Sequence, residues 1–148
     1  MNGKKILPEE IKVLGNHFVQ AWDKGDWVSL DKLLTEDFVF HVAVPGLQPN
    51  REGYKQFFDM HHKAFPDFHA TVEDVIIEDD KIVHRMKWHG THKSEFMGIA
   101  PTNKKVIISL ITIERIANSK IVEQWGEADM LGLMGQLGVM SPPGQAGK

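Results

Sequence analysis

The first part of the chain carries apolar residues at the spacing of an α-helix. A helix that begins at Pro8, a residue suited to a first helical position, places Ile11, Leu14 and Phe18 on one face. Gly25 is expected to end this helix, because glycine readily adopts the backbone conformation of a helix C-terminus. The pattern therefore predicts an amphipathic N-terminal helix that packs on a core.

Two further helices are predicted before the middle of the chain. Asp26 can cap a short helix that follows directly. Farther on, Tyr54, Phe58 and Phe65 recur at helical spacing, and Pro66 stops that helix. Helices thus dominate the first half of the sequence.

The second half has the period of two that is typical of β-strands. Short polar turns at residues 79–80 and 118–119 separate the apolar runs and favour antiparallel hairpins. Glycines at 132, 135 and 138 accompany a short terminal helix. Strands are predicted at residues 38–44, 68–78, 82–93, 105–117 and 120–129. Helices followed by a run of strands predict the α+β class, with helices packed on one face of a curved sheet.

Length and composition restrict the possible functions. The 148 residues fit one domain, 1–148, with a core at about 8–138 and a mobile tail at 139–148. The chain has no cysteine, which excludes disulfides and thiolate catalysis. No basic run interleaved with aromatics indicates nucleic-acid binding, and no apolar run or signal sequence indicates a membrane or export. A cytoplasmic location is the expectation.

Three stretches carry a likeness to a known family. They are residues 51–54 (REGY) with 64–67 (AFPD), residues 90–92 (GTH) with 96–102 (FMGIAPT), and residues 114–116 (ERI) with 120–125 (KIVEQW). Together they resemble the SnoaL-like polyketide cyclase and ester cyclase family of the nuclear-transport-factor-two-like superfamily, over about residues 8–138.

The resemblance implies a fold and a reaction. The fold is cone-shaped, with a strongly curved antiparallel sheet, N-terminal helices over its concave face and a hydrophobic pocket inside: a cystatin-like α+β barrel. The reaction is an intramolecular aldol closure without cofactor, in which an Asp of the last strand removes a proton from carbon and a His stabilises the enolate. Relatives on this fold include isomerases, dehydratases and proteins without catalysis, so the fold alone does not fix the reaction.

The chain departs from the cyclase pattern in the last strand. The position of the catalytic Asp falls at or near Gly126, and Gln124 stands where a His is common. Asp129 fits the Trp-x-x-x-Asp spacing of the ester cyclases and is the predicted general base, because partial burial raises the pKa of a carboxylate toward the range that suits proton abstraction. The alternative for Asp129 is a helix-capping role where the strand ends.

Other side chains are candidates for the pocket. His92 and His41 are predicted to orient the substrate or to stabilise the oxyanion. The predicted lining is mostly apolar with a few polar groups, as small-molecule sites are; the alternative is ordinary core packing. The predicted substrate-binding residues are Phe18, Trp22, Phe57, His61, His84, Met86, Trp88 and Trp125.

Neither a metal nor another cofactor is expected. The histidine pairs at 61–62 and at 89 and 92 lack the spacing of chelating histidines, and no phosphate loop or serine elbow is present. Three functions stay open. The first is a cofactor-independent cyclase-type enzyme that performs aldol-type closure, isomerisation or dehydration on a small apolar carbonyl compound. The second is a non-catalytic binding protein of the same fold. The third is an interaction protein that uses the open sheet face only for dimerisation, and the predicted inward-facing His84, His92 and Asp129 argue against it.

A homodimer is also predicted. In the strand at 105–117, Ile107 and Ile111 share one face, while Val106 and Ile108 share the other. A strand that is apolar on both faces is usually covered on both. Helices can cover only one face of this sheet, so a second copy of the chain is the expected cover for the other.

Overall fold

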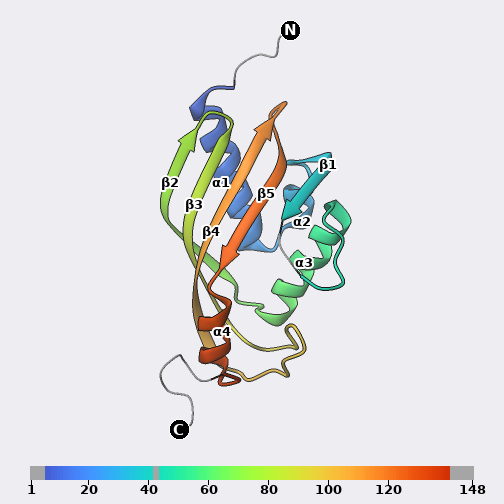
Figure 1. Cartoon of the computed structure of the whole chain (residues 1–148), viewed down its shortest axis with the longest axis vertical. Coiled ribbons are helices and arrows are strands. Elements are labelled where there is room, and N and C mark those ends of the chain that lie inside the picture. Colours follow the sequence, from blue (N-terminus) through green and yellow to red (C-terminus); the bar gives the residue numbers. More distant parts are fainter. Residues whose placement is uncertain (1–5, 42–43, 141–148) are drawn as a thin grey trace.

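The structure, a computed structural model, describes residues 6–41 and 44–140. Its elements are α1 (Pro8–Lys24), α2 (Trp27–Asp31), β1 (Leu34–His41), α3 (Arg51–Ala64), β2 (His69–Glu78), β3 (Lys81–Thr91), β4 (Lys105–Ala117), β5 (Lys120–Ala128) and α4 (Met130–Leu137). This is the predicted α+β class, with three helices before the run of long strands (Figure 1). In the described part of the chain, no helix is long and apolar enough to span a membrane. Most of the predicted tail, residues 141–148, lies outside the described residues.

The five strands form one sheet in the order β1-β5-β4-β3-β2. Strands β2 to β5 are antiparallel to their neighbours, as predicted, but β1 runs parallel to β5. The predicted antiparallel sheet therefore has one parallel pair, at the β1 edge. The reason is that the chain passes through α3 and the whole β2–β5 meander before it returns beside β1, which leaves β1 free to pair in either direction.

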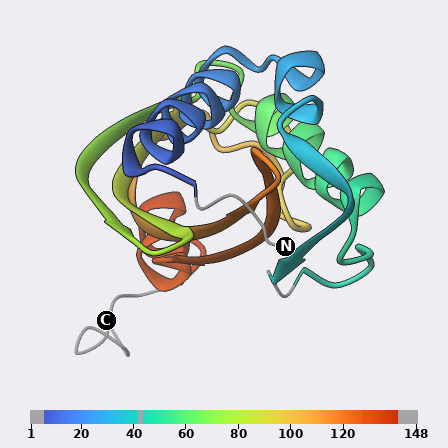
Figure 2. The same ribbon diagram turned by 90° about the horizontal axis from the view of Figure 1, so that it is seen from above.

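The sheet is strongly curved, and its two edge strands, β1 and β2, do not pair with each other. The α1 and α3 helices lie on its concave side (Figure 2). The first strand begins at Leu34 rather than at residue 38 and ends at His41. Residues 42 and 43 of the predicted strand lie outside the described residues.

Local signals set the helix ends. Gly25 ends α1 with a positive φ of 66°, and Asn50 caps α3 by accepting a hydrogen bond from the Gly53 backbone N–H at 3.0 Å. Gly53 permits a close chain crossing, since a Cβ at this position would lie 1.7 Å from the Gln48 carbonyl oxygen. These signals fix where α3 begins, and α3 supplies one wall of the interior.

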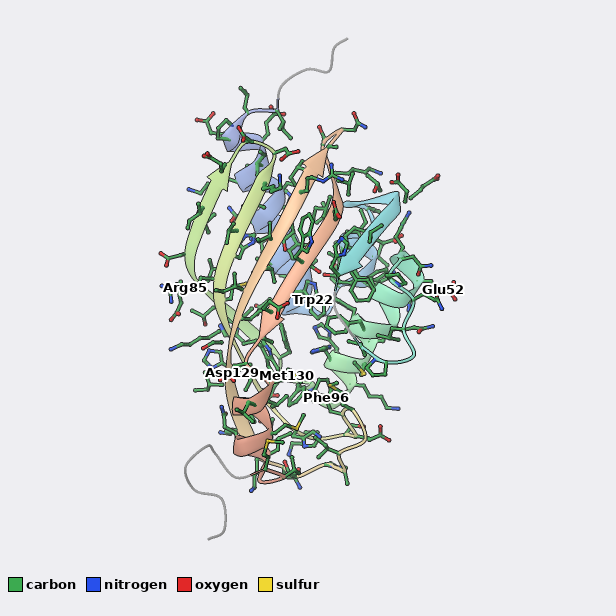
Figure 3. All side chains as sticks on the ribbon, viewed as in Figure 1. Trp22, Glu52, Arg85, Phe96, Asp129 and Met130 are labelled. Carbon is green, nitrogen blue, oxygen red and sulfur yellow. The ribbon has the colours of Figure 1, made fainter. Side chains whose placement is uncertain are left out.

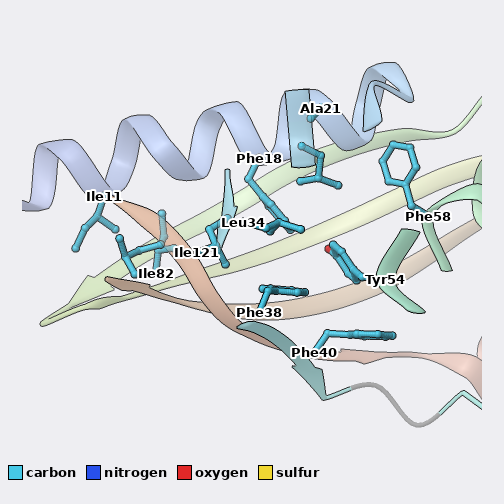
Figure 4. Close-up of a cluster of buried hydrophobic side chains, with 12 residues drawn as sticks. Ile11, Phe18, Ala21, Leu34, Phe38, Phe40, Tyr54, Phe58, Ile82 and Ile121 are labelled. Atoms are coloured by element: carbon cyan, nitrogen blue, oxygen red, sulfur yellow. The ribbon is translucent and has the colours of Figure 1, made fainter. Parts of the chain in front are cut away.

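The core lies between α1, α3 and the concave face of the sheet. Phe38 and Phe40 of β1 pack on Tyr54 of α3, with ring centroids 5.0 and 5.1 Å apart, and Phe18 of α1 is buried above them (Figure 4). Each buried Phe contributes about 1.5–3 kcal/mol relative to an exposed one. A second buried cluster at the other end of the sheet includes Leu133 of α4. The interior is therefore covered by helices along its length.

The outer face of β4 stays partly apolar. Val106 and Ile108 are buried and lie on the inner face, whereas Ile107 and Ile111 are 54% and 47% exposed. The homodimer stays a prediction. We expect the protein to sediment as a dimer at micromolar concentration and the Ile107→Lys/Ile111→Lys double variant to sediment as a monomer, because two buried lysines would leave uncompensated charge in the interface.

The matched control for this experiment is Val28→Lys. Val28 is exposed and lies on α2, not on β4. Its substitution should leave the sedimentation coefficient unchanged. A wild-type protein that is monomeric under these conditions contradicts the predicted dimer.

Candidate functional site

A cavity of about 280 Å³ lies between α1, α3 and the concave face of the sheet. Trp22, near the C-terminal end of α1, lies in this interior, whereas Arg85 and Glu52 lie on the outside (Figure 3). The volume is near the lower end of the range typical of small-ligand sites. The lining residues are Phe18, Val19, Trp22, Val44, Tyr54, Phe57, His61, Phe68, Ala70, Met86, Trp88, Phe96, Met97, Leu110, Thr112, Gln124, Gly126, Glu127, Ala128 and Met130.

Aromatic rings form a large part of the wall. The indole of Trp22 contacts Phe57 and Phe68, with ring centroids 6.0 and 5.8 Å apart, and its Nε1–H donates a hydrogen bond to the Tyr54 hydroxyl at 2.9 Å. Burial raises the pKa of Tyr54 far above its ordinary value, so this side chain stays a neutral hydroxyl. This part of the wall is therefore largely apolar, and a planar ligand can pack against it.

His61 is the basic side chain on this wall. Its Nδ1 lies 3.0 Å from the Phe57 carbonyl oxygen, which can only accept, so Nδ1 carries a proton and donates. Among the described residues, the other ring nitrogen, Nε2, has no hydrogen-bond partner. Burial lowers the pKa of His61 to about 4, the Phe57 carbonyl partly opposes this shift, and nearby His62 adds to it. The ring is thus neutral at physiological pH, with a lone pair on Nε2.

A buried polar network lies on the concave face of the sheet. The Glu114 carboxylate accepts a hydrogen bond from His84 Nδ1 at 2.9 Å and another from Gln124 Nε2 at 3.0 Å, and it has no exposed surface. Gln124 lines the cavity, whereas Glu114 and His84 lie beyond its wall. Gly15 of α1 permits this packing, since a Cβ there would lie 3.2 Å from the His84 ring. The network fixes the Gln124 amide at the wall.

The structure places six of the eight predicted substrate-binding residues at the cavity. They are Phe18, Trp22, Phe57, His61, Met86 and Trp88. His84 instead belongs to the buried network, and Trp125 stacks on His41 with ring centroids 5.0 Å apart. Trp125 is directed to the other face because it alternates with Gln124 and Gly126 along β5.

Asp129, the predicted general base, lies next to α4 rather than in the cavity wall (Figure 3). Strand β5 ends at Ala128, and the Asp129 side chain accepts a hydrogen bond from the Gly132 backbone N–H at 2.8 Å. It is therefore the N-cap of α4, which is the alternative that the sequence left open. Its catalytic role stays a prediction.

The two predicted oxyanion-stabilising histidines also lie away from the described lining. His41 is exposed and pairs with Glu123 at 2.6 Å. His92 is buried against the Phe65 ring, and its Nδ1 accepts a hydrogen bond from the Thr102 backbone N–H at 3.2 Å. Each ring is thus held by a structural contact, and the catalytic roles of both stay predictions.

The sequence reasoning missed polar residues on the concave face of β4 and β5. Thr112 and Glu114 fall in register with Val106 and Ile108 along the strand predicted at 105–117, and Gln124 falls on the matching face of the next strand. Polar residues on an otherwise apolar strand face are a recognisable signal, because buried polar groups need partners. The polar residues at positions 112, 114 and 124 could therefore have been identified from the alternation of the sequence.

Protonation of His61 is expected to reduce stability at acidic pH. Its pKa is about 4 in the folded protein and 6.5 in the unfolded chain, so the unfolded state binds more protons between these values. Stability is lost as the pH falls below 6.5, by about 2 kcal/mol at pH 5 through this group alone. Urea denaturation at pH 7 and pH 5 measures the loss. The His61→Gln variant should show a smaller loss, and an equal loss in both proteins would contradict the burial effect.

The comparisons with known proteins assign the family. The model of the SnoaL-like polyketide cyclases matches residues 12–137. The chain belongs to this family. No curated protein matches it significantly.

Solved structures of the SnoaL-like fold superpose closely on the chain. TsrD from Streptomyces laurentii is 27% identical with a TM-score of 0.83, covering 92% of this chain and 100% of its own. AclR from Streptomyces galilaeus, a proposed hydroxylase, is 28% identical with a TM-score of 0.80, covering 90% and 88%. IdmH from Streptomyces antibioticus, a proposed polyketide cyclase, is 30% identical with a TM-score of 0.76, covering 87% and 99%.

Strand β5 is where the resemblance implies a catalytic carboxylate. Gly126 lines the cavity together with its same-face neighbours Gln124 and Ala128. Glu127 is the one carboxylate among the described lining residues, but it is exposed and pairs with Ile111, a residue of the outer face. The carboxylate that the resemblance implies near position 126 is thus replaced by a glycine, and the basic group with a free lone pair at this cavity is His61.

Proposed function

We propose that the protein is a cofactor-independent acid–base enzyme that acts on a small, neutral carbonyl compound inside this cavity. The reaction is proton abstraction from the carbon next to the carbonyl, followed by aldol-type closure or a related isomerisation or dehydration. The observation that carries the proposal is the buried, neutral His61, whose Nδ1 is fixed on the Phe57 carbonyl and whose Nε2 is free at a cavity wall. Membership of the SnoaL-like polyketide cyclase family supports the same reaction class.

In this mechanism His61 Nε2 accepts the proton from carbon. The low pKa of the free enzyme makes the ring a weak base toward water, because its burial opposes a lone positive charge. During proton abstraction, however, a negative enolate forms beside the imidazolium, and an opposite charge at short range favours the protonated ring. The imidazolium and the enolate form next to each other. Their attraction in the transition state therefore offsets part of the desolvation cost that lowers the resting pKa of His61.

One observation favours the alternative of a binding protein without turnover. The strand position that the resemblance assigns to a catalytic carboxylate is Gly126, and Glu127, the one carboxylate among the described lining residues, is exposed. Under this alternative the aromatic wall holds an apolar ligand and His61 only accepts a hydrogen bond from it.

Deuterium exchange distinguishes the two functions. The probe is 2-tetralone, a neutral bicyclic ketone, incubated with the protein in D₂O at neutral pH and followed by proton NMR at the carbons next to the carbonyl. The enzyme proposal expects exchange well above the buffer rate, saturating with ketone concentration. Saturable binding of 2-tetralone without faster exchange would leave the binding protein as the function.

A further inference from the structure

Thr112 is a polar group at the cavity for which the protein supplies no partner. The residue lines the cavity, is only 5% exposed, and its hydroxyl has no hydrogen-bond partner in the described part of the chain. A buried hydroxyl without a partner is unfavourable, and native proteins usually satisfy such groups. An unsatisfied hydroxyl beside a ligand-sized cavity therefore points to a hydrogen-bond partner on a ligand.

The neighbouring side chains explain why the hydroxyl is left alone. On β3, His84 lies directly across from Thr112, but its Nδ1 donates to Glu114. Glu114, two residues along β4 on the same face, uses its second oxygen for Gln124. On β5, Gly126 lies directly across and has no side chain to offer.

We propose that Thr112 determines substrate specificity by binding a neutral oxygen, the carbonyl oxygen of the substrate. The hydroxyl oxygen is covered in the rotamer present, and rotation about the Thr112 Cα–Cβ bond turns it toward the cavity, where it can donate to such an oxygen. The glycine opposite leaves space for a ligand to approach the sheet. In the reaction, the same hydroxyl donates to the enolate oxygen as His61 takes the proton from the neighbouring carbon. This inference rests on the proposed function in taking the cavity as the substrate site.

The charge of the wall limits the ligand further. None of the described lining residues is a lysine or an arginine, and the single carboxylate, Glu127, is exposed. A ligand carboxylate would be buried without a counter-ion, which is strongly unfavourable. The ligand class is therefore a neutral, largely apolar ring compound with a carbonyl oxygen, not a carboxylic acid.

The test compares ligands with and without the oxygen in proteins with and without the hydroxyl. Tryptophan fluorescence titrations measure the affinity for 2-tetralone and for tetralin, the same ring system without oxygen, since Trp22 and Trp88 line the cavity. The wild-type protein should prefer 2-tetralone by about five- to tenfold, the value of one hydrogen bond. Thr112→Val, which keeps the shape and removes the hydroxyl, should bind both probes about equally.

The chain offers a matched control variant. Thr35 of β1 also has a buried hydroxyl without a partner among the described residues, but it does not line the cavity. Thr35→Val should keep the preference for 2-tetralone. Without ligand, both valine variants should melt a few degrees higher than wild type, because each loses an unsatisfied buried hydroxyl.

The outcomes separate this inference from the proposed function. A preference for 2-tetralone that persists in Thr112→Val overturns the role of Thr112, even if the protein still catalyses deuterium exchange. A preference that depends on Thr112 in a protein without exchange supports the inference and overturns only the enzyme. Equal wild-type affinity for both probes, binding of neither, or equally tight binding of tetrahydro-2-naphthoate overturns the proposed ligand class.

Discussion

Replacing Glu114 by alanine is expected to reduce the free energy of unfolding by about 3–5 kcal/mol, the cost of breaking a buried, hydrogen-bonded pair. The substitution leaves two donors, His84 Nδ1 and Gln124 Nε2, without their acceptor in an interior with no exposed surface at this point. It also opens a cavity where the carboxylate was. Urea denaturation at neutral pH measures the loss.

Glu114→Gln is the matched control for this experiment. The amide has nearly the same volume and keeps one acceptor oxygen, so the Gln124 hydrogen bond can persist while the amide nitrogen donates to the other tautomer of His84. Its cost should stay below about half that of Glu114→Ala, since both hydrogen bonds made at this position can be kept. If the alanine variant loses less than about 1 kcal/mol, the network does not carry the stability assigned to it.

Local signals made much of the fold predictable. Pro8 and Asn50 mark helix starts, and the turn residues Asp79 and Asn118 adopt the positive φ angles that suit tight hairpins. The period of two placed the hairpin strands nearly correctly, because each is directed by its own burial pattern. The direction of β1 was missed, because its pairing with β5 joins segments about eighty residues apart and leaves no local pattern.

The candidate site was predictable only in part, for a similar reason. The aromatic wall followed from helical spacing, which placed Trp22 and His61 on inward faces. Whether Asp129 belonged to the strand or capped the helix depended on a single residue at the end of β5, and strand ends are poorly determined by sequence. The role of Glu114 in joining His84 to Gln124 required three strands in register, which only the structure supplies.

The His61→Gln variant is expected to lower the rate of enzyme-catalysed deuterium exchange by about 10²–10⁴-fold, the usual contribution of a general base. Glutamine removes the basic nitrogen but keeps an amide N–H that can donate to the Phe57 carbonyl, as His61 Nδ1 does. The fold and the affinity for 2-tetralone should therefore change little, and the loss should appear in kcat rather than in KM.

Asp129→Asn tests the competing general base in the same assay. Asparagine caps helices about as well as aspartate, so the hydrogen bond to the Gly132 N–H and the start of α4 should persist. Because the Asp129 carboxylate is not among the described residues that line the cavity, the exchange rate of Asp129→Asn should stay within about twofold of wild type. The pH dependence adds a second criterion: a neutral His61 keeps the wild-type rate level down to about pH 5 and loses it as the pH approaches the ring's pKa of about 4. If Asp129→Asn abolishes exchange while His61→Gln retains it, proton abstraction occurs at the end of β5, and the His61 mechanism is wrong.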